Sequence, residues 1–423
     1  MLNNDIRVSE KKLPIAVYFL CTLFIVFFSV HAIQNWQPHL AQSAIILACI
    51  LPAFIVLAYN WSSLIKNKTW PVEFKIVLVL TILGMLNICF SENQLASLKG
   101  MSLYLMSGIL VFSISYSLFD NKQTQMRFFY LCSFCFIILL GFGTYEFIQQ
   151  IYASGKRILL FSGNPIPAGS LLILLSIGPL VLLGKSKSNW QRIFWVFCIL
   201  SGAFLITLIA QRGPALAMVI MAFFLAATKR KGIWIFTLVA LVLVTTGYQL
   251  ADKVPPQLKN ELLRKETLLV RMELYHIALD VIKEKPIFGL GFNSSLSRFI
   301  PDDYQSKIYP TDQTYSFQSM VAGVHVFDNM ALSFLGEMGG LFTMAYLGLG
   351  VYLLINVVTV LRKPTLLDNM QVILTLVVLA GFTAHSMTFD SLKYPHLNWI
   401  FHSLLGLIAR HKVTDQKIKT NAT

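Results

Sequence analysis

The chain has 423 residues, of which 56% are apolar and only 13% are charged, and its mean hydropathy is +0.66. A soluble domain with so few charges would be poorly solvated, so the composition indicates an all-α polytopic membrane protein. The sequence lacks the alternating segments of about ten residues that build a transmembrane β-barrel.

Apolar runs of sufficient length recur along the whole chain. With roughly 20 residues needed for each span, they predict about twelve transmembrane helices. These lie at about 13–33, 40–59, 76–92, 99–119, 128–149, 166–184, 190–210, 214–228, 232–250, 328–360, 370–388 and 395–410. The tenth run is overlong, so we expect a separate short helix near Asn329 and a second helix after Gly339 and Gly340.

The charges between the runs predict an orientation. Lys and Arg concentrate in cytoplasmic loops, and a cytoplasmic N-terminus places the whole formal net charge of +14 on that side. Both termini are then expected inside, and the expected domains are spans 1–9 (1–250), an outer loop (251–327), spans 10–12 (328–411) and a cytoplasmic tail (412–423). Because orientation explains the basic excess, nucleic acid is excluded as a partner.

The outer loop contains a predicted helix over about 257–285. Leu274, Ile277, Ala278, Val281 and Ile282 follow the three- and four-residue spacing of one apolar helix face. Pro286 is expected to end the helix, and Gly289 and Gly291 mark a turn. The polar and aromatic stretch 293–324 has no clear period, so we expect either a functional lid or partial disorder.

Two arginines are candidates for binding an anion. Arg212 lies in a tight outer turn before Gly213 and Pro214; it either snorkels to the interface or faces a polar cavity or an anion at membrane depth. Arg271 lies on the loop helix with Tyr275 one turn later, and a solvated helix face is its alternative interpretation. Two guanidinium groups would suit a pyrophosphate, whose oxygens they grip in fork geometry.

Titratable residues gather where the loop returns to the membrane. His325 has the side chain that best takes a proton from a hydroxyl near neutral pH, and Asp328 could orient it. His385 and Asp390, at the outer end of the eleventh span, form a second polar cluster that could face the same cavity. A structural role is the alternative for a lone histidine, and Glu146 is a weaker candidate.

Metal-ligand patterns are absent from the sequence. All six cysteines lie in apolar runs, so they are interpreted as small core residues, and the spacing of Cys132 and Cys135 alone is weak evidence for a metal. No His, Cys, Asp or Glu cluster has metal-site spacing. We therefore expect neither a metal nor another cofactor.

At these residues the sequence resembles the O-antigen ligase and polymerase superfamily of bacterial envelope glycosyltransferases. The resemblance covers the topology of the whole chain and several short motifs within about 160–345. The motifs are Ser162–Pro165, Gln211–Pro214, Arg271–Tyr275 leading into Pro286–Gly291, and His325–Gly339. The resemblance implies a GT-C-like fold with one large periplasmic loop, containing helices, between spans 9 and 10 of a bacterial inner-membrane protein.

The activity implied is metal-independent, inverting transfer of a glycan from undecaprenyl pyrophosphate to a sugar hydroxyl of the lipid A–core, as part of lipopolysaccharide biosynthesis. Carried over to this chain, Arg212 and Arg271 would bind the departing pyrophosphate, and His325 would activate the acceptor hydroxyl. Family members often carry His-Asn where this chain has Asp328 and Asn329. Either His325 is shifted into the same place or Asp328 shares the role of base.

Three other functions remain open at this point. An O-antigen polymerase or a protein O-oligosaccharyltransferase would use the same lipid-linked donor with a different acceptor. A lipid flippase or transporter would need charges inside several spans and internal repeat symmetry, and neither is present. The sequence leaves the oligomeric state open, and membrane lipids are its expected surroundings.

Overall fold

The computed structural model describes part of the chain, and every regular element in that part is helical. The described residues are 12–28, 43–44, 46–48, 50–56, 58, 72–102, 107–153, 160, 165–209, 211–228, 266–292, 294, 299, 327–361 and 366–420. The expected ninth span, most of 293–324 and the candidate base His325 lie outside them.

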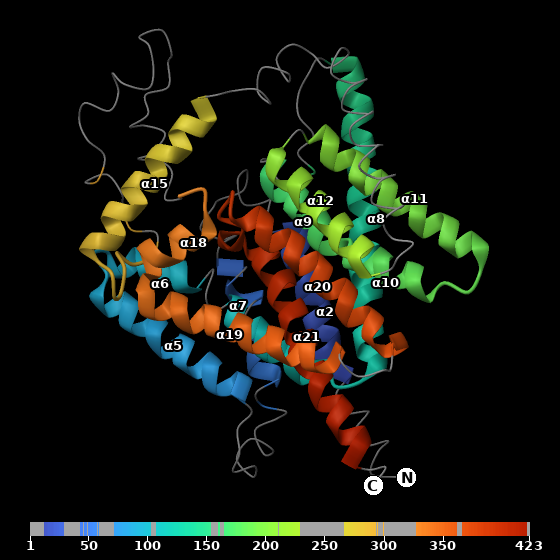
Figure 1. Ribbon diagram of the computed structural model, residues 1–423, viewed down its shortest axis with the longest axis horizontal. Helices are drawn as coiled ribbons and strands as arrows, with labels where there is room; N and C mark the ends of the chain where they lie inside the picture. Colours follow the sequence, from blue (N-terminus) through green and yellow to red (C-terminus); the bar gives the residue numbers. More distant parts are fainter. Residues whose placement is uncertain are drawn as a thin grey trace.

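The described helices form a bundle (Figure 1). In chain order they are α2 (Lys12–Phe28), α5 (Val72–Phe90), α6 (Gln94–Gly100), α7 (Ser107–Leu118), α8 (Lys122–Ala153), α9 (Pro165–Leu175), α10 (Ile177–Lys185), α11 (Asn189–Leu208), α12 (Arg212–Thr228), α15 (Glu266–Glu284), α18 (Met330–Ser333), the π-helix η3 (Phe334–Met338), α19 (Gly339–Leu361), α20 (Leu366–Ser386), the 3₁₀ turn η4 (Ser391–Lys393) and α21 (Pro395–Thr420). The lower end of α21 and the helix α15 lie at opposite ends of the bundle.

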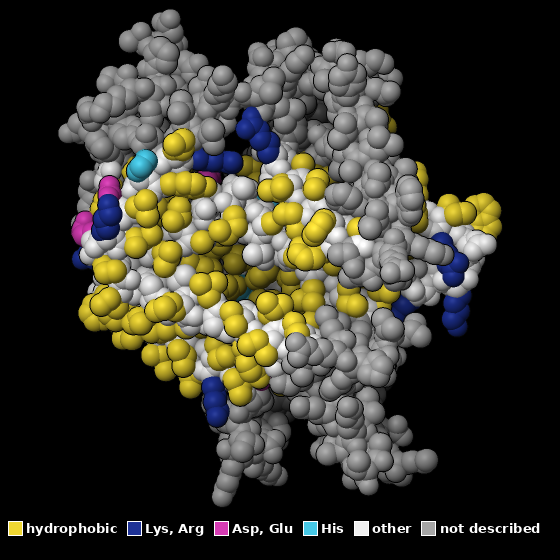
Figure 2. All heavy atoms as spheres, in the orientation of Figure 1, with side chains coloured by type: hydrophobic (Ala, Val, Ile, Leu, Met, Phe, Trp, Pro, Cys, Tyr) yellow, Lys and Arg dark blue, Asp and Glu magenta, His cyan; other side chains and the backbone are white. Residues whose placement is uncertain are grey.

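Within the described residues, five helical segments are long and apolar enough to cross a membrane: Val72–Phe90, Lys122–Gln149, Ile166–Lys185, Asn189–Leu208 and Met330–Val358. Shorter apolar helices accompany them, including Arg212–Ala226 and Met370–Ser386. The space-filling view shows hydrophobic side chains spread over the visible face of the bundle (Figure 2). The described part of the chain is thus all-helical and consistent with a polytopic membrane protein, and the number of twelve spans stays a prediction.

The centre of the bundle carries polar groups that are paired with one another. The ring of Tyr18 stacks on Trp399, with centroids 5.8 Å apart, and its hydroxyl lies 2.6 Å from Ser403 Oγ. Trp399 Nε1 donates to Thr22 Oγ1 over 2.9 Å. These contacts join α2 to α21 inside an apolar core, where an unpaired polar group would be costly.

The overlong tenth run is broken where the sequence predicted a break. The short helix α18 continues into η3, and Gly339 then adopts φ +80°, a conformation that side chains with a Cβ rarely take. The long apolar helix α19 begins at this glycine. Of the fourth run, expected as a single span at 99–119, the end of α6 and the helix α7 are described, and 103–106 lie outside the described residues.

The predicted apolar face of the loop helix is confirmed in α15. Leu274, Ile277, Ala278 and Val281 are buried, and α15 packs against α18 and η3. The helix ends at Glu284, just before Pro286, and Gly289 and Gly291 both have positive φ angles. The expected first turns of this helix, before Glu266, lie outside the described residues.

Candidate functional site

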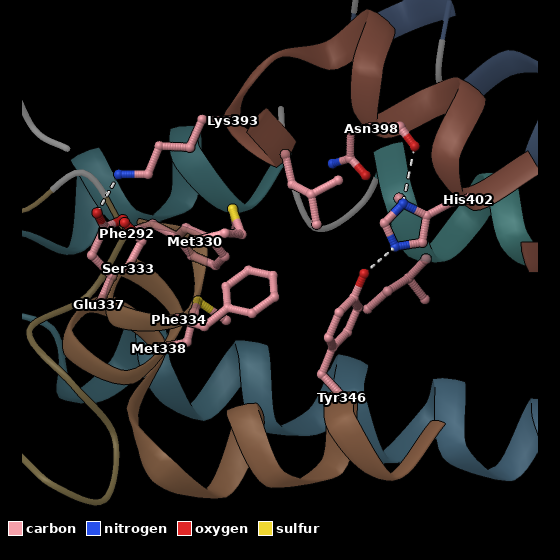
Figure 3. A pocket seen from close by; sticks show the side chains of 13 residues that line it. Phe292, Met330, Ser333, Phe334, Glu337, Met338, Tyr346, Lys393, Asn398 and His402 are labelled. Atoms are coloured by element: carbon pink, nitrogen blue, oxygen red, sulfur yellow. Dashed lines mark hydrogen bonds and ion pairs between the residues drawn. The ribbon is translucent and has the colours of Figure 1, made fainter. Parts of the chain in front are cut away.

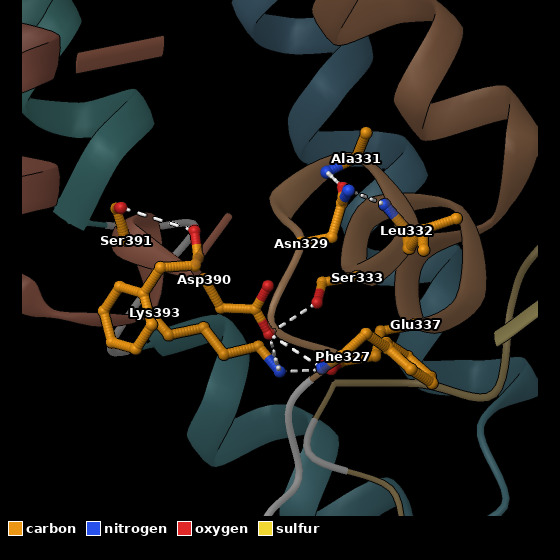
Figure 4. Close-up of polar contacts among 10 residues, drawn as sticks. Phe327, Asn329, Ala331, Leu332, Ser333, Glu337, Asp390, Ser391 and Lys393 are labelled. Atoms are coloured by element: carbon orange, nitrogen blue, oxygen red, sulfur yellow. Dashed lines mark hydrogen bonds and ion pairs between the residues drawn. The ribbon is translucent and has the colours of Figure 1, made fainter. Parts of the chain in front are cut away.

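Asp390 lies at the centre of a buried polar network (Figure 4). It stands in the turn between α20 and η4 and is completely buried. Its Oδ2 atom accepts hydrogen bonds from the Phe327 amide over 3.1 Å and from Ser333 Oγ over 2.6 Å. The carboxylate therefore fixes the backbone that leads into α18 against the outer end of α20.

Lys393 brings a cation to this network from the end of η4. Its ammonium group forms an ion pair with Glu337 of η3 and lies 3.8 Å from Asp390 Oδ2. The side chains of Lys393, Glu337 and Asp390 are only 9%, 5% and 0% exposed. Charges this deeply buried need such partners, because desolvation of an unpaired ion is costly. Lys393 was not among the residues that the sequence predicted for the site.

Arg271 and Asp328 form the more accessible part of the site. Arg271 Nε lies 3.5 Å from Asp328 Oδ2, and both side chains are about one-third exposed. Burial raises the pKa of Asp328, and the neighbouring charge of Asp390 raises it further, whereas Arg271 opposes the shift. The structure thus brings together two residues that were predicted as site residues from separate motifs.

Asp328 also has a strained backbone. Its φ angle is +50°, in the left-handed region that residues with a side chain seldom occupy. Asn329, a further candidate, caps α18: its Oδ1 accepts from the amides of Ala331 and Leu332 over 3.0 and 3.2 Å. The cap and the Asp390 contact hold the strained residue from its two sides. Strain of this kind is found at functional sites.

His385 is a buried member of the same region. It lies in the last turn of α20, 1% exposed, with Nε2 2.6 Å from Ser170 Oγ. The Ser170 hydroxyl donates to the carbonyl of Ile166, so it accepts from His385 and the imidazole carries its proton on Nε2. His385 Nδ1 is buried and has no hydrogen-bond partner among the described residues.

Arg212 reaches this region through its neighbour Gly213. A Cβ atom on Gly213 would come within 2.3 Å of His385 Nδ1, so only a glycine allows α12 to approach α20 so closely. Arg212 itself is exposed at the first position of α12. The segment that carries Arg212 therefore meets α20 at His385.

The remaining candidates are placed differently. Tyr275 is half-buried on α15, one turn after Arg271. Glu146 Oε2 accepts from the amide of Leu160 over 3.0 Å, which gives it a structural contact. Across the described part of the chain, no group of three His, Cys, Asp or Glu side chains is arranged to hold a metal ion.

The turn after α15 docks on η3 through its main chain. The amides of Leu290 and Gly291 donate to the carbonyls of Gly336 and Glu337, each over 2.9 Å. Gly289 permits this approach, since a Cβ there would lie 2.5 Å from the carbonyl of Glu337. These bonds hold α15, and with it Arg271, against the segment that carries Asp328 and Glu337.

Asn87 strengthens the same contact from within α5. This asparagine is 1% exposed, and its Nδ2 donates to the carbonyls of Phe288 and Glu337 over 2.6 and 2.7 Å. This role was not predicted from the sequence. An uncharged polar residue near the end of an apolar helix is the signal that could have indicated it.

A cavity lies beside the buried network and extends into the bundle (Figure 3). It is small, with a volume of about 30 Å³. Lys393, Glu337 and Ser333 line one part and Tyr346, Asn398 and His402 another, while Tyr346 Oη and His402 Nε2 are 2.9 Å apart. Its apolar walls come from Ile109, Phe292, Met330, Phe334, Met338 and Leu392.

Comparison with known protein families gives a match to part of the chain. Residues 199–347 match the family model described as O-antigen ligase. This match, which covers about a third of the chain, supports membership of the O-antigen ligase superfamily. No curated protein matches the chain.

The O-antigen ligase match covers only part of the site. It spans α12, α15, η3 and the start of α19, and so includes Arg212, Arg271 and Asp328. The residues at 385–402 that complete the site lie beyond it. In this member of the superfamily, the matched segment and the C-terminal helices together build the network around Asp390.

Proposed function

We propose that this chain is an O-antigen ligase that transfers a glycan from undecaprenyl pyrophosphate to a sugar hydroxyl of the lipid A–core. The main support is the Arg271–Asp328 pair, at 3.5 Å, above the network formed by Asp390, Lys393 and Glu337. This arrangement places an anion-binding group and a proton acceptor side by side at one end of a helical bundle. Such a pair suits a reaction with an anionic leaving group and a hydroxyl nucleophile.

In the proposed reaction, the acceptor oxygen attacks the anomeric carbon of the donor glycan. The bond from that carbon to the pyrophosphate oxygen breaks, and the pyrophosphate leaves with the electron pair of that bond. Arg271 and Arg212 stabilise the charge of the departing group. The acceptor proton passes to a base, for which Asp328 and His325 are the two candidates. Direct displacement gives inversion at the anomeric carbon.

Asp328 has two properties that support its candidacy as the base. Its pKa is raised, which brings its proton affinity closer to that needed for accepting a proton near neutral pH. It also stays partly exposed, with 28% of its side chain accessible, so a substrate can reach it. His325 stays a candidate on its chemistry and its place in the motif.

The distribution of charges along the chain fits a donor that is linked to a membrane lipid. The positive-inside distribution supports a loop helix at the periplasmic face of the bacterial inner membrane, with both termini in the cytoplasm. We infer a twelve-span topology with spans 1–9 before the loop.

Deletion of the gene tests which acceptor receives the glycan. A strain without an O-antigen ligase keeps its lipid-linked O-antigen but has none attached to the lipid A–core, which a lipopolysaccharide gel shows directly. Single-repeat lipopolysaccharide in the deletion strain would identify a polymerase instead. An unchanged gel, together with loss of glycan from proteins, would identify a protein O-oligosaccharyltransferase.

A further inference from the structure

We propose that Lys393 is a positioning residue for the transfer reaction, one that acts on the Arg271–Asp328 pair through Asp390 and Glu337. The inference rests on the proposed function and assigns a role to a residue outside the segment matched to the family. Lys393 is almost completely buried. Its ammonium group lies between two carboxylates that belong to different parts of the chain (Figure 4).

The first connection runs from Lys393 to Asp328. The Lys393 ammonium lies 3.8 Å from Asp390 Oδ2, and the same oxygen accepts the hydrogen bond from the Phe327 amide. Phe327 directly precedes Asp328, whose φ angle of +50° depends on its neighbours being held. The cation therefore fixes the carboxylate that anchors the strained residue.

The second connection runs from Lys393 to Arg271. Lys393 pairs with the side chain of Glu337, whose carbonyl accepts hydrogen bonds from the Gly291 amide and from Asn87. Gly291 belongs to the turn that ends α15, the helix that carries Arg271. One buried cation thus joins the two segments that bring Arg271 and Asp328 to 3.5 Å.

Removal of the cation would take away the positive charge that lies between the buried carboxylates of Glu337 and Asp390. Like charges in a region of low dielectric repel strongly, so one of the two side chains would move. Movement of Asp390 would release the Phe327 amide, and movement of Glu337 would shift η3 under the α15 turn. Either change would alter the geometry of the reacting groups and leave the substrate contacts themselves in place.

The test compares purified wild-type protein with Lys393→Met, Lys393→Arg and the double variant Glu337→Gln/Lys393→Met. The double variant removes one carboxylate together with the ammonium, so it keeps the protein folded where the single Met variant is unstable. Lys283→Met is the matched control, because Lys283 is 76% exposed and pairs with Asp280 on the surface of α15. Each variant is assayed for kcat and KM with a labelled glycan on undecaprenyl pyrophosphate and purified lipid A–core. Hydrogen exchange at the peptide containing Phe327 is measured by mass spectrometry.

We expect Lys393→Met and the double variant to lose about tenfold or more in kcat, with the donor KM changed by less than about twofold. Exchange at the Phe327 peptide should become faster in both, Lys393→Arg should recover part of the rate, and Lys283→Met should match the wild type. In an Asp390→Asn background, Lys393→Met should have a smaller effect than in the wild type, since only the connection through Glu337 is then left to lose.

Wild-type kcat and unchanged Phe327 exchange in the double variant would overturn the proposal, because the ion pair would then serve stability alone. A loss that is fully additive with Asp390→Asn would overturn it as well. Failure of the proposed function is a separate result. In that case the wild-type protein transfers no glycan, while the exchange measurement still decides whether Lys393 holds Asp390 in place.

Discussion

Asp390 Oδ2 accepts the amide hydrogen bond of Phe327, 63 positions earlier in the chain, over 3.1 Å. The same carboxylate binds Ser333 and approaches Lys393. Asp390 therefore holds the backbone that carries Asp328. The predicted site residues thus fall into two groups: Arg271 and Asp328, whose side chains are about one-third exposed, and Asp390, which is buried and supports them.

Replacement of Arg271 by alanine should lower the transfer rate by about 10²- to 10³-fold, the range found when one preorganised charge-stabilising donor is removed. Lysine should restore only part of the rate, because an ammonium group cannot provide the two-pronged contact of a guanidinium. The measurement is kcat/KM in the reconstituted transfer assay. His276→Ala on the exposed side of the same helix is the control, and full activity of Arg271→Ala would remove Arg271 from the site.

The raised pKa of Asp328 predicts a pH dependence of the reaction. If Asp328 is the base, the rate should rise as the pH increases through this raised pKa, because only the carboxylate accepts a proton. Asp328→Asn should abolish that rise, and His325→Ala should leave it intact. The opposite pattern in kcat-against-pH profiles would assign the base role to His325.

The same shift has a consequence for stability. The folded state binds the Asp328 proton more tightly than the unfolded chain does, since burial raises the pKa above the usual Asp value of 3.8. The free energy of unfolding should therefore fall as the pH rises from this value through the raised pKa. Asp328→Asn should reduce this slope in thermal unfolding of the detergent-solubilised protein. A slope identical in the two proteins would argue against the shift.

Gly213→Ala should destabilise the contact between α12 and α20. The added methyl group would meet the His385 ring, and overpacking of this kind costs about 1–3 kcal/mol. Activity should fall as well, because Arg212 is the neighbouring residue. Gly141→Ala and Gly348→Ala are matched controls, since a Cβ at either glycine meets no atom within 4 Å. Equal unfolding temperatures for all three variants would contradict the packing seen at His385.

The sequence predicted those parts of the fold that depend on local pattern. The apolar face of α15 and its end before Pro286 follow from spacing and from the chemistry of proline, and Gly339 breaks the tenth apolar run as expected. The motifs also selected Arg271 and Asp328, which the structure pairs. His325 lies outside the described residues, so its place in the site stays a prediction.

The buried contacts that hold the Arg271–Asp328 pair in place were not predictable from local sequence pattern. Lys393 meets Glu337 across 56 positions of sequence, and a lysine in a short loop shows nothing of a distant carboxylate. Asn87 meets Glu337 across 250 positions. The π-helical turn at η3 was missed as well, because its shape depends on the glycine turn that docks against it. Contacts of this kind arise from packing between helices that carry no shared signal in the sequence.

The α15 turn is recognised by main-chain groups, and this has a consequence for how the protein can diverge. The hydrogen bonds from Leu290 and Gly291 to η3 use no side-chain atom of the turn. The glycines are restricted by the close approach, and Phe288 and Leu290 are restricted by their packing against Phe90 and in an apolar cluster. Exposed positions such as Ile287 can therefore vary while the two halves of the site keep their alignment.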